Sequence, residues 1–95
     1  MTYELQFHEL ALKEWRKLGA PIQKQFKKKL AERLETPHVT GSKLSGMPDS
    51  YKIKLRSSGY RLVYQVRDEK LWIMVIAVGK RDRSAVYRAA AARLK

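Results

Sequence analysis

The sequence predicts an α+β domain in which helices cover one face of a mostly antiparallel four-stranded sheet, in the order β-α-α-β-β-β-α. Two patterns predict this class. The spacing of apolar residues changes from every second residue to a helical period near the N-terminus, and it returns to every second residue in the centre of the chain. Clusters of turn-forming residues separate these segments. With 95 residues, the chain is expected to form a single domain over 1–95.

The N-terminal segment predicts a strand followed by a helix. Apolar and polar residues alternate over 3–7, which is typical of a half-buried strand. Over 9–18 the apolar residues, including Trp15, fall on one face of a helix. Gly19 suits the position just beyond the C-terminus of that helix.

A second helix is expected over 21–35, antiparallel to the first. Proline at its first position is favourable, and Thr36 followed by Pro37 ends the periodic pattern. The apolar stripe of this helix contains Phe26, which we expect to pack against Trp15. The four-stranded sheet is predicted to pack on these two helices.

The remainder of the chain predicts three strands and a last helix. Residues 38–50 are rich in turn formers and indicate a connection. Strands are expected at 51–56 and 60–66, where apolar and polar residues alternate. The stretch 71–78 is apolar on both faces, which indicates an interior strand covered on both sides. The alanine-rich segment 85–94 has a strong intrinsic preference for helix.

The turn between the two central strands admits two registers. A two-residue loop, Ser58-Gly59, would pair Leu55 with Leu62, and a four-residue loop would shift the pairing by two residues. Both registers place the apolar residues toward the helices and four cations on the other face, namely Lys52, Lys54, Arg56 and Arg61. Like charges gathered across strands destabilise a sheet, and no acidic residue occurs over 50–67 to neutralise them. The pattern predicts a phosphate-binding surface, the alternative being a solvated sheet face.

The overall charge also indicates a polyanionic partner. The chain has 21 Lys and Arg against 9 Asp and Glu, which gives a net charge of +12 and a pI near 10.2. Such an excess costs self-repulsion in the folded state, so we expect a nucleic acid as partner, before an anionic membrane. Solubility alone is the alternative explanation. Three lysines of the second helix lie off its apolar stripe and could add to the binding surface: Lys24, Lys27 and Lys28.

The residue types restrict the chemistry. The chain has no cysteine, which excludes a disulfide or a thiolate zinc site. His8 and His38 lack the spacing of metal ligands and are expected to be surface histidines. Neither a glycine-rich phosphate loop nor a nucleophile elbow is present, so we expect no metal and no cofactor. Lysine, arginine and tyrosine suit attack by a ribose 2′-OH on its own phosphate, where the charge developing on the phosphoryl group must be stabilised.

Further candidate residues follow the interior strand. Lys80, Arg81 and Arg83 come directly after it, and Tyr87 lies about one turn into the last helix. A tyrosine is more often a packing residue, but beside cations it can stack on a base. The lack of cysteine, of a basic and apolar leader and of an apolar run long enough for a membrane predicts a cytoplasmic protein without a membrane partner.

Three segments resemble the RelE family of toxins, which belongs to the RelE/ParE superfamily of type II toxin–antitoxin systems. They are the run YKIKLRSSGYRLVYQV at 51–66, VGKR at 78–81 and ALKEWRKLG at 11–19. The resemblance covers the whole chain. It implies the RelE-like variant of the microbial ribonuclease fold and a metal-independent endoribonuclease, an mRNA interferase. Such a toxin would cleave mRNA in the A site of the 70S ribosome, where it contacts 16S ribosomal RNA. It would leave 2′,3′-cyclic phosphate and 5′-OH ends, be monomeric when free, and be neutralised by a RelB-type antitoxin.

The resemblance also assigns roles to five matching positions. It implies that Lys52 and Arg61 hold the phosphate and its developing charge, and that Lys54 or Tyr87 is the base. Arg81 would be the acid or a charge stabiliser, and Tyr87 would also stack on an mRNA base. We expect further contacts to RNA and the ribosome from Arg56, Lys80, Arg83, Lys24, Lys27 and Lys28.

Three alternatives come from other functional classes. A gyrase-inhibiting toxin of the ParE type shares the fold but lacks the constellation of basic residues and tyrosine. A non-catalytic RNA-binding module would explain the charge but not Tyr87 beside Arg81. A ribosome-independent nuclease is expected to use His and Glu for acid–base chemistry.

Overall fold

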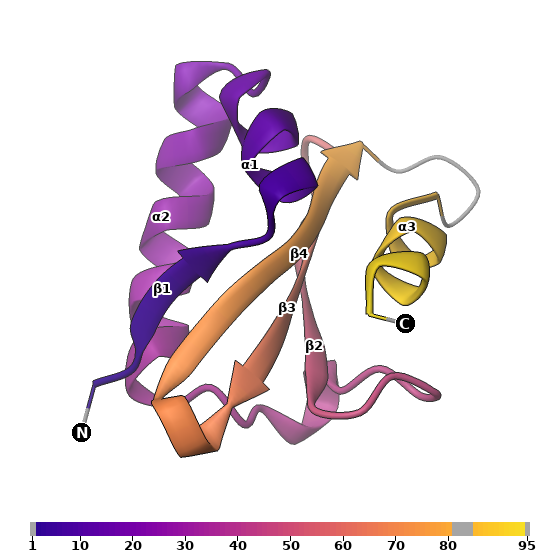
Figure 1. The fold of residues 1–95 in the computed structure, drawn as a ribbon. Helices are drawn as coiled ribbons and strands as arrows, with labels where there is room; N and C mark the ends of the chain where they lie inside the picture. The colour runs from indigo at the N-terminus through magenta and orange to yellow at the C-terminus, as the bar shows by residue number, and fades with distance from the viewer. Residues whose placement is uncertain (1, 81–84, 95) are drawn as a thin grey trace.

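Four strands form one sheet in the computed structural model, which describes residues 2–80 and 85–94 (Figure 1). The order across the sheet is β1-β4-β3-β2. β1 runs parallel to β4, whereas β4 with β3 and β3 with β2 are antiparallel, which confirms the mostly antiparallel sheet. The strands are β1 (Glu4–Phe7), β2 (Ser50–Leu55), β3 (Tyr60–Arg67) and β4 (Trp72–Lys80).

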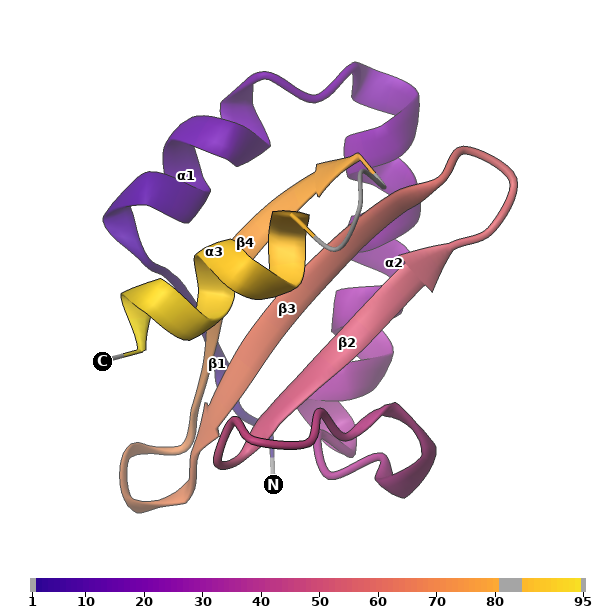
Figure 2. The same cartoon turned by 90° about the vertical axis from the view of Figure 1, so that its right-hand side faces the viewer.

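The described helices lie on both faces of the sheet. α1 (Glu9–Arg16) and α2 (Ala20–Glu35) cover one face, and α3 (Ala85–Arg93) covers part of the other (Figures 1 and 2). The prediction of helices on one face is therefore wrong for α3. The physical reason is that β4 is buried on both sides, so each of its faces needs an apolar cover. Of the described helices, none has an apolar stretch that could traverse a bilayer.

The larger core lies between the sheet and the helices α1 and α2. The Trp15 ring packs against Phe26, with 6.1 Å between ring centroids, and against Phe7, with 5.4 Å. This confirms the predicted contact between the two helices. Alternate residues of β2 and β3, among them Ile53, Leu55 and Leu62, point into this core, so the residues between them must point toward the opposite face.

A bulge in β4 shapes the second, smaller core under α3. Val63 pairs with Ala77 but the next residue, Tyr64, pairs with Val75, so Ile76 is an additional residue in β4. The bulge turns two consecutive side chains, Ile76 and Ala77, toward α3, where they pack with Val63 and with residues of the helix. The alternation then resumes, and Val78 faces the larger core.

The hairpin between β2 and β3 uses the four-residue loop. Leu55 pairs with Tyr60 and Lys54 with Arg61, so the two-residue alternative is wrong. Gly59 closes the loop with an N–H that donates to the Leu55 carbonyl at 2.8 Å. Its φ of 76° lies in the left-handed region that glycine adopts without steric cost. The faces of the strands remain as predicted.

Two short 3₁₀ turns connect elements of the described chain, and the second offers a stability test. η1 (Thr40–Ser42) precedes β2, and η2 (Asp68–Lys70) links β3 to β4. Leu71, which follows η2, has φ 54° and ψ 45°, a left-handed conformation that costs a leucine about 1–2 kcal/mol. Asparagine tolerates this region better, so Leu71→Asn is expected to raise the free energy of unfolding by about 0.5–1 kcal/mol in urea denaturation.

The control for this substitution is Leu10→Asn. Leu10 is also an exposed leucine, at 44% against 36% for Leu71, but it lies in α1, where asparagine is a poorer helix former. This variant should therefore be less stable than the wild type. A Leu71→Asn protein that is no more stable than the wild type would show that contacts of the leucine side chain outweigh the backbone strain.

Candidate active site and nucleic-acid interface

The cations of the hairpin lie on the face of the sheet that carries α3. Lys54 is directly opposite Arg61 and Lys52 is opposite Val63, and paired residues share a face. Val63 is fully buried in the core beneath α3. Lys52, which is paired with it, and Arg61, two residues before it, therefore point to the same face as α3. α3 crosses β4 and β3 but leaves β2 uncovered, so the lysines of β2 remain accessible (Figure 2). The prediction of a shared face is confirmed for Lys52, Lys54 and Arg61, whereas Arg56 lies in the turn beyond β2.

Tyr87 joins this surface through Arg61. One guanidinium nitrogen of Arg61, Nη1, donates a hydrogen bond to the Tyr87 hydroxyl at 2.9 Å. The guanidinium carbon also lies 5.8 Å from the centroid of the Tyr87 ring, within the range of a cation–π contact. Tyr87 stands in the first turn of α3, so the position of this helix determines where the tyrosine lies relative to Arg61. Arg81 and Arg83, also predicted for the site, lie outside the described residues.

Two adjoining hollows follow the cations across the hairpin. The first, of about 330 Å³, is lined by Lys54, Leu55, Arg56, Gly59, Tyr60 and Arg61. The second, of about 460 Å³, extends toward α2 and is lined by Lys29, Arg33, Gly41, Ser42, Lys52, Lys54 and Arg56. They share Lys54 and Arg56, and no carboxylate lines either of them. We call their cations the cationic groove: Lys29, Arg33, Lys52, Lys54, Arg56 and Arg61.

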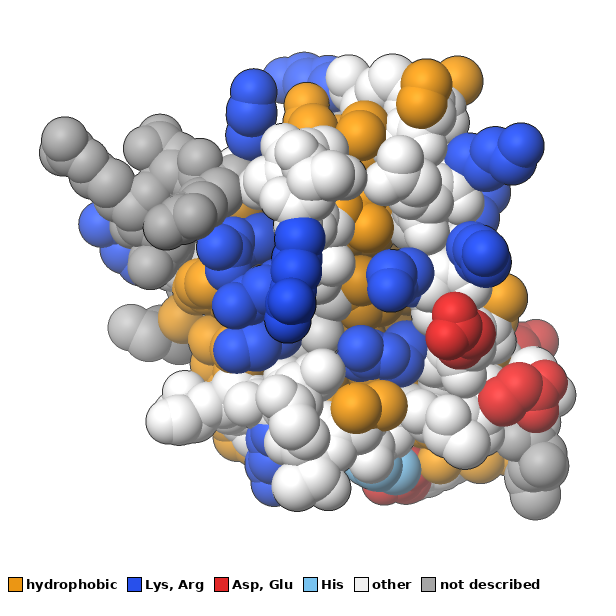
Figure 3. Space-filling model, turned by 180° about the vertical axis from the view of Figure 1, so that it is seen from behind, with side chains coloured by type: hydrophobic (Ala, Val, Ile, Leu, Met, Phe, Trp, Pro, Cys, Tyr) orange, Lys and Arg blue, Asp and Glu red, His pale blue; other side chains and the backbone are white. Residues whose placement is uncertain are grey.

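The space-filling view shows the same concentration of charge. Lys and Arg side chains gather across the middle of the face in Figure 3, and the Asp and Glu side chains visible there lie toward the right-hand and lower margins. The neighbouring cations can each neutralise a phosphate and release its counterions, so the groove suits the backbone of a nucleic acid.

Two cations of the groove, Lys29 and Arg33, were not among the predicted binding residues. The Arg33 guanidinium donates to the Tyr64 hydroxyl at 2.9 Å, to the Ser42 hydroxyl at 3.3 Å and to the Lys52 carbonyl at 3.4 Å. These bonds hold α2 against the outer edge of β2. Lys29 and Arg33 are four residues apart and so lie on the same side of α2. This spacing was the only sequence pattern that could have indicated that the two cations belong to one surface.

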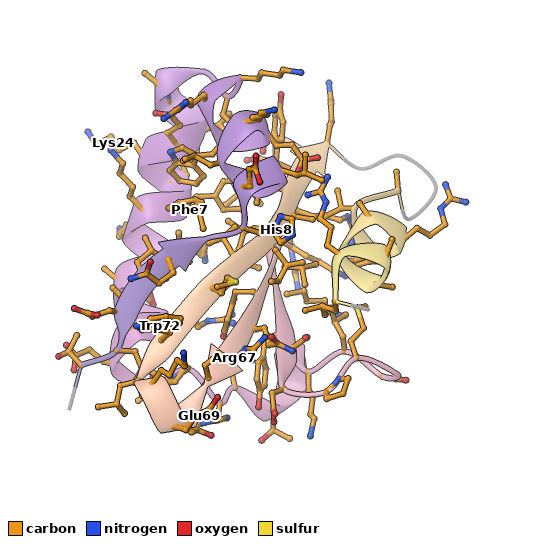
Figure 4. All side chains as sticks on the ribbon, viewed as in Figure 1. Phe7, His8, Lys24, Arg67, Glu69 and Trp72 are labelled. Carbon is orange, nitrogen blue, oxygen red and sulfur yellow. The ribbon has the colours of Figure 1, made fainter. Side chains whose placement is uncertain are left out.

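Four further predicted cations that the structure describes lie apart from the groove. Lys24, Lys27 and Lys28 are exposed on α2 but do not line either hollow, and Figure 4 shows Lys24 pointing away from the sheet. Lys80 is exposed at the end of β4 and pairs with Tyr60, whose side chain packs against the larger core. Lys80 therefore leaves the sheet on the face opposite to Arg61.

The two histidines have structural contacts outside the groove. The His8 ring accepts a hydrogen bond from the Leu10 N–H and caps α1 (the residue is labelled in Figure 4). His38 lies between the Tyr51 hydroxyl, at 3.0 Å, and the Asp68 carboxylate, at 2.9 Å. Hydrogen bonds from Tyr3 and His38 lower the pKa of Asp68. Within residues 2–80 and 85–94, His, Cys, Asp and Glu form no group of three or more that could hold a metal ion.

The comparisons with known proteins agree with this fold and surface. The model of the ParE toxin of the type II toxin–antitoxin system parDE matches residues 5–85. The mRNA interferase toxin RelE of Escherichia coli K12 is 64% identical over 94 residues, which are 99% of each chain.

Two solved structures of the E. coli toxin extend the comparison. The free RelE (R81A/R83A) mutant has a TM-score of 0.92 and 61% identity over all of both chains. RelE in the intact RelBE toxin–antitoxin complex has a TM-score of 0.82 and 65% identity, over 85% of this chain and 99% of that one. Together with the matching family model, these similarities show that the chain belongs to the RelE/ParE family of type II toxins.

Proposed function

We propose that this protein is an endoribonuclease toxin that cleaves mRNA in the A site of the ribosome. The observation that carries the proposal is the Arg61–Tyr87 pair, which lies directly beside Lys54 at one end of the cationic groove. A fixed guanidinium, a phenol and an amine thus meet on a surface that suits a ribose–phosphate backbone. The similarity to the E. coli mRNA interferase RelE supports the same activity.

The reaction is an attack of a ribose 2′-oxygen on the adjacent phosphorus. A base accepts the 2′-OH proton, the bond from phosphorus to the 5′-oxygen breaks, and an acid donates a proton to that oxygen. The products are a 2′,3′-cyclic phosphate and a 5′-OH end. Lys52 and Arg61 stabilise the phosphoryl charge, Lys54 or Tyr87 is the base, and Arg81 is the acid or a further charge stabiliser.

The ribosome supplies the geometry that the shallow groove cannot provide. The hollows are open to solvent and lined by long lysine and arginine side chains, so free RNA would bind in many orientations. Orienting the reacting groups can lower a barrier by about 7–11 kcal/mol, and an mRNA held in the A site has that orientation. Contacts of the remaining cations with 16S ribosomal RNA would then anchor the toxin.

Neutralisation completes the proposed cycle. The RelE chain of E. coli is seen in complex with its antitoxin RelB. The high identity to that chain supports a RelB-type antitoxin as the partner of this protein, which acts in the cytoplasm and is monomeric when free.

Primer extension tests the proposal on one mRNA, programmed on ribosomes or free in solution. Cuts in the A-site codon are expected only on ribosomes, with 5′-OH ends, because the chain depends on the ribosome for orientation. Arg67→Ala, which removes an exposed charge at the end of β3 away from Arg61, should cut like the wild type. Equal cutting of free and ribosome-bound mRNA would contradict the dependence on the ribosome. If neither mRNA is cut, the proposed endoribonuclease activity is wrong.

A second candidate function is gyrase inhibition, because the matching family model is that of the ParE toxin. That match ends at residue 85 and so does not include Tyr87, one of the residues that distinguish the two functions. A supercoiling assay with purified gyrase is the corresponding measurement. Inhibition of gyrase without cleavage of mRNA would favour this candidate.

A further inference from the structure

An ion pair connects the end of α3 to α1. The Arg93 guanidinium donates to both carboxylate oxygens of Glu14, from Nη1 to Oε1 at 2.7 Å and from Nη2 to Oε2 at 3.0 Å. The side chains are largely withdrawn from solvent, with 14% of Arg93 and 33% of Glu14 exposed. Two parallel charge-assisted bonds of this kind are among the stronger and more directional polar contacts in proteins.

The same two side chains also bind the backbone of β4, at its bulge and two residues beyond it. Arg93 Nη1 donates to the carbonyl of Ile76, the additional residue, at 2.9 Å. The N–H of Val78 donates to Glu14 Oε1 at 3.2 Å. The pairing of β1 with β4 ends at Val75, so the ion pair occupies the strand edge just beyond it. The ion pair therefore joins α3, the bulge of β4 and α1 at one point.

α3 depends on such contacts for its position. The helix has nine residues, and helices of this length are marginal by themselves in water. Its fully or nearly buried apolar residues are Val86 and Ala90, a small apolar surface for a docked helix. Val86 packs over Gly79 of β4, where a Cβ would lie 3.4 Å from the valine Cγ2.

We propose that Glu14 and Arg93 are positioning residues that hold α3 on the bulge of β4 and thereby set Tyr87 against Arg61. Arg93 is six residues after Tyr87 on the same helix, about 9 Å along its axis. Releasing the C-terminal end of α3 therefore frees the tyrosine to move relative to the groove. The effect on catalysis rests on the proposed function, whereas the docking of α3 does not.

The test compares Arg93→Met with Arg88→Met. Arg93→Met keeps the aliphatic stem but removes the guanidinium, whereas Arg88 is exposed on the same helix. Amide hydrogen exchange over 85–93 is expected to accelerate about 10- to 100-fold in Arg93→Met, with little change at Val63 and Val75 in the core of the sheet. Arg88→Met should exchange like the wild type.

A double-mutant cycle then links the helix to the reaction. The single-turnover rate of mRNA cleavage should fall about tenfold or more in Arg93→Met, because Tyr87 is no longer held in place. In a Tyr87→Ala background, the same substitution should cause no further loss. A role in stability alone would lower the rate in both backgrounds.

Each outcome decides one part of the proposal. Unchanged exchange over 85–93 would overturn the docking role whether or not the protein cleaves mRNA. Equal rate losses with and without Tyr87 would overturn the link to the tyrosine. If the wild type does not cleave mRNA, the proposed function fails and hydrogen exchange still decides the docking. If Arg93→Met does not fold, Glu14→Gln and Arg93→Lys replace it, with the same acceleration over 85–93 expected to a smaller degree.

Discussion

Replacing Lys54 by alanine is expected to lower the single-turnover rate of mRNA cleavage by about 10²- to 10⁴-fold, with little loss of ribosome affinity. Lys54 faces Arg61 across the hairpin and lines both hollows of the cationic groove. It is therefore the amine best placed to act on a ribose–phosphate held by Arg61. The measurement is the cleavage rate on pre-formed complexes, together with the dissociation constant of the toxin from programmed ribosomes.

Arg56→Ala is the matched control for Lys54→Ala. Arg56 also lines both hollows and is also exposed, but it lies in the turn beyond the last pair of the hairpin. Both substitutions remove one charge from the groove, so an effect of charge alone would be the same for both. We expect Arg56→Ala to cost less than about tenfold in rate. Equal losses for the two variants would mean that Lys54 only binds, and its catalytic role would be wrong.

Removing Arg61 is expected to have the second large effect, a loss of about 10²- to 10³-fold in the single-turnover rate with Arg61→Ala. The substitution removes a half-buried charge from the groove and also the hydrogen-bond partner of Tyr87. Arg61→Lys keeps the charge but not the planar group that meets the hydroxyl and the ring, so it should restore only part of the rate.

Arg67→Ala provides the control on the same strand. Arg67 is the exposed last residue of β3, where its Nε donates to the Gln65 side chain at 2.8 Å, at the end of the strand away from Arg61 (Figure 4). Arg67→Ala should leave the single-turnover rate of mRNA cleavage unchanged. A full rate in Arg61→Lys would mean that the charge is sufficient and that the contact with Tyr87 has no part in the reaction.

The strands and their faces could be predicted because burial imposes an alternating pattern on them. Ile53, Leu55 and Leu62 point to the larger core as expected, and this alone places Lys52, Lys54 and Arg61 on the other face. The choice between the two hairpin registers could not be made, since both satisfy the same alternation. It depends on the left-handed backbone at Gly59, which the sequence permits but does not require.

The position of α3 and the bulge at Ile76 were not predictable in the same way. An alanine-rich helix has a weak apolar face, so its sequence does not indicate which surface it covers. The apolar residues on both faces of β4 indicated that some element must pack on each face, but they did not identify α3 as the element on the second face. Lys29 and Arg33 join the groove because α2 packs beside β2, and their spacing of four residues shows only that they share a side of the helix, not which strand they approach.

Because β2 lies at the edge of the sheet, its lysines also affect the tendency of the protein to aggregate. A strand at the edge of a sheet has unpaired backbone groups that can template association with another chain, and lysines on the edge oppose this. Lys52 and Lys54, with Arg33 bound to the Lys52 carbonyl, keep this edge charged. Replacing both lysines by apolar residues is expected to inactivate the toxin and also to expose a less charged edge that favours aggregation. Inactive variants for work at high concentration are therefore better made at Tyr87, which lies on a helix and leaves the charged edge intact.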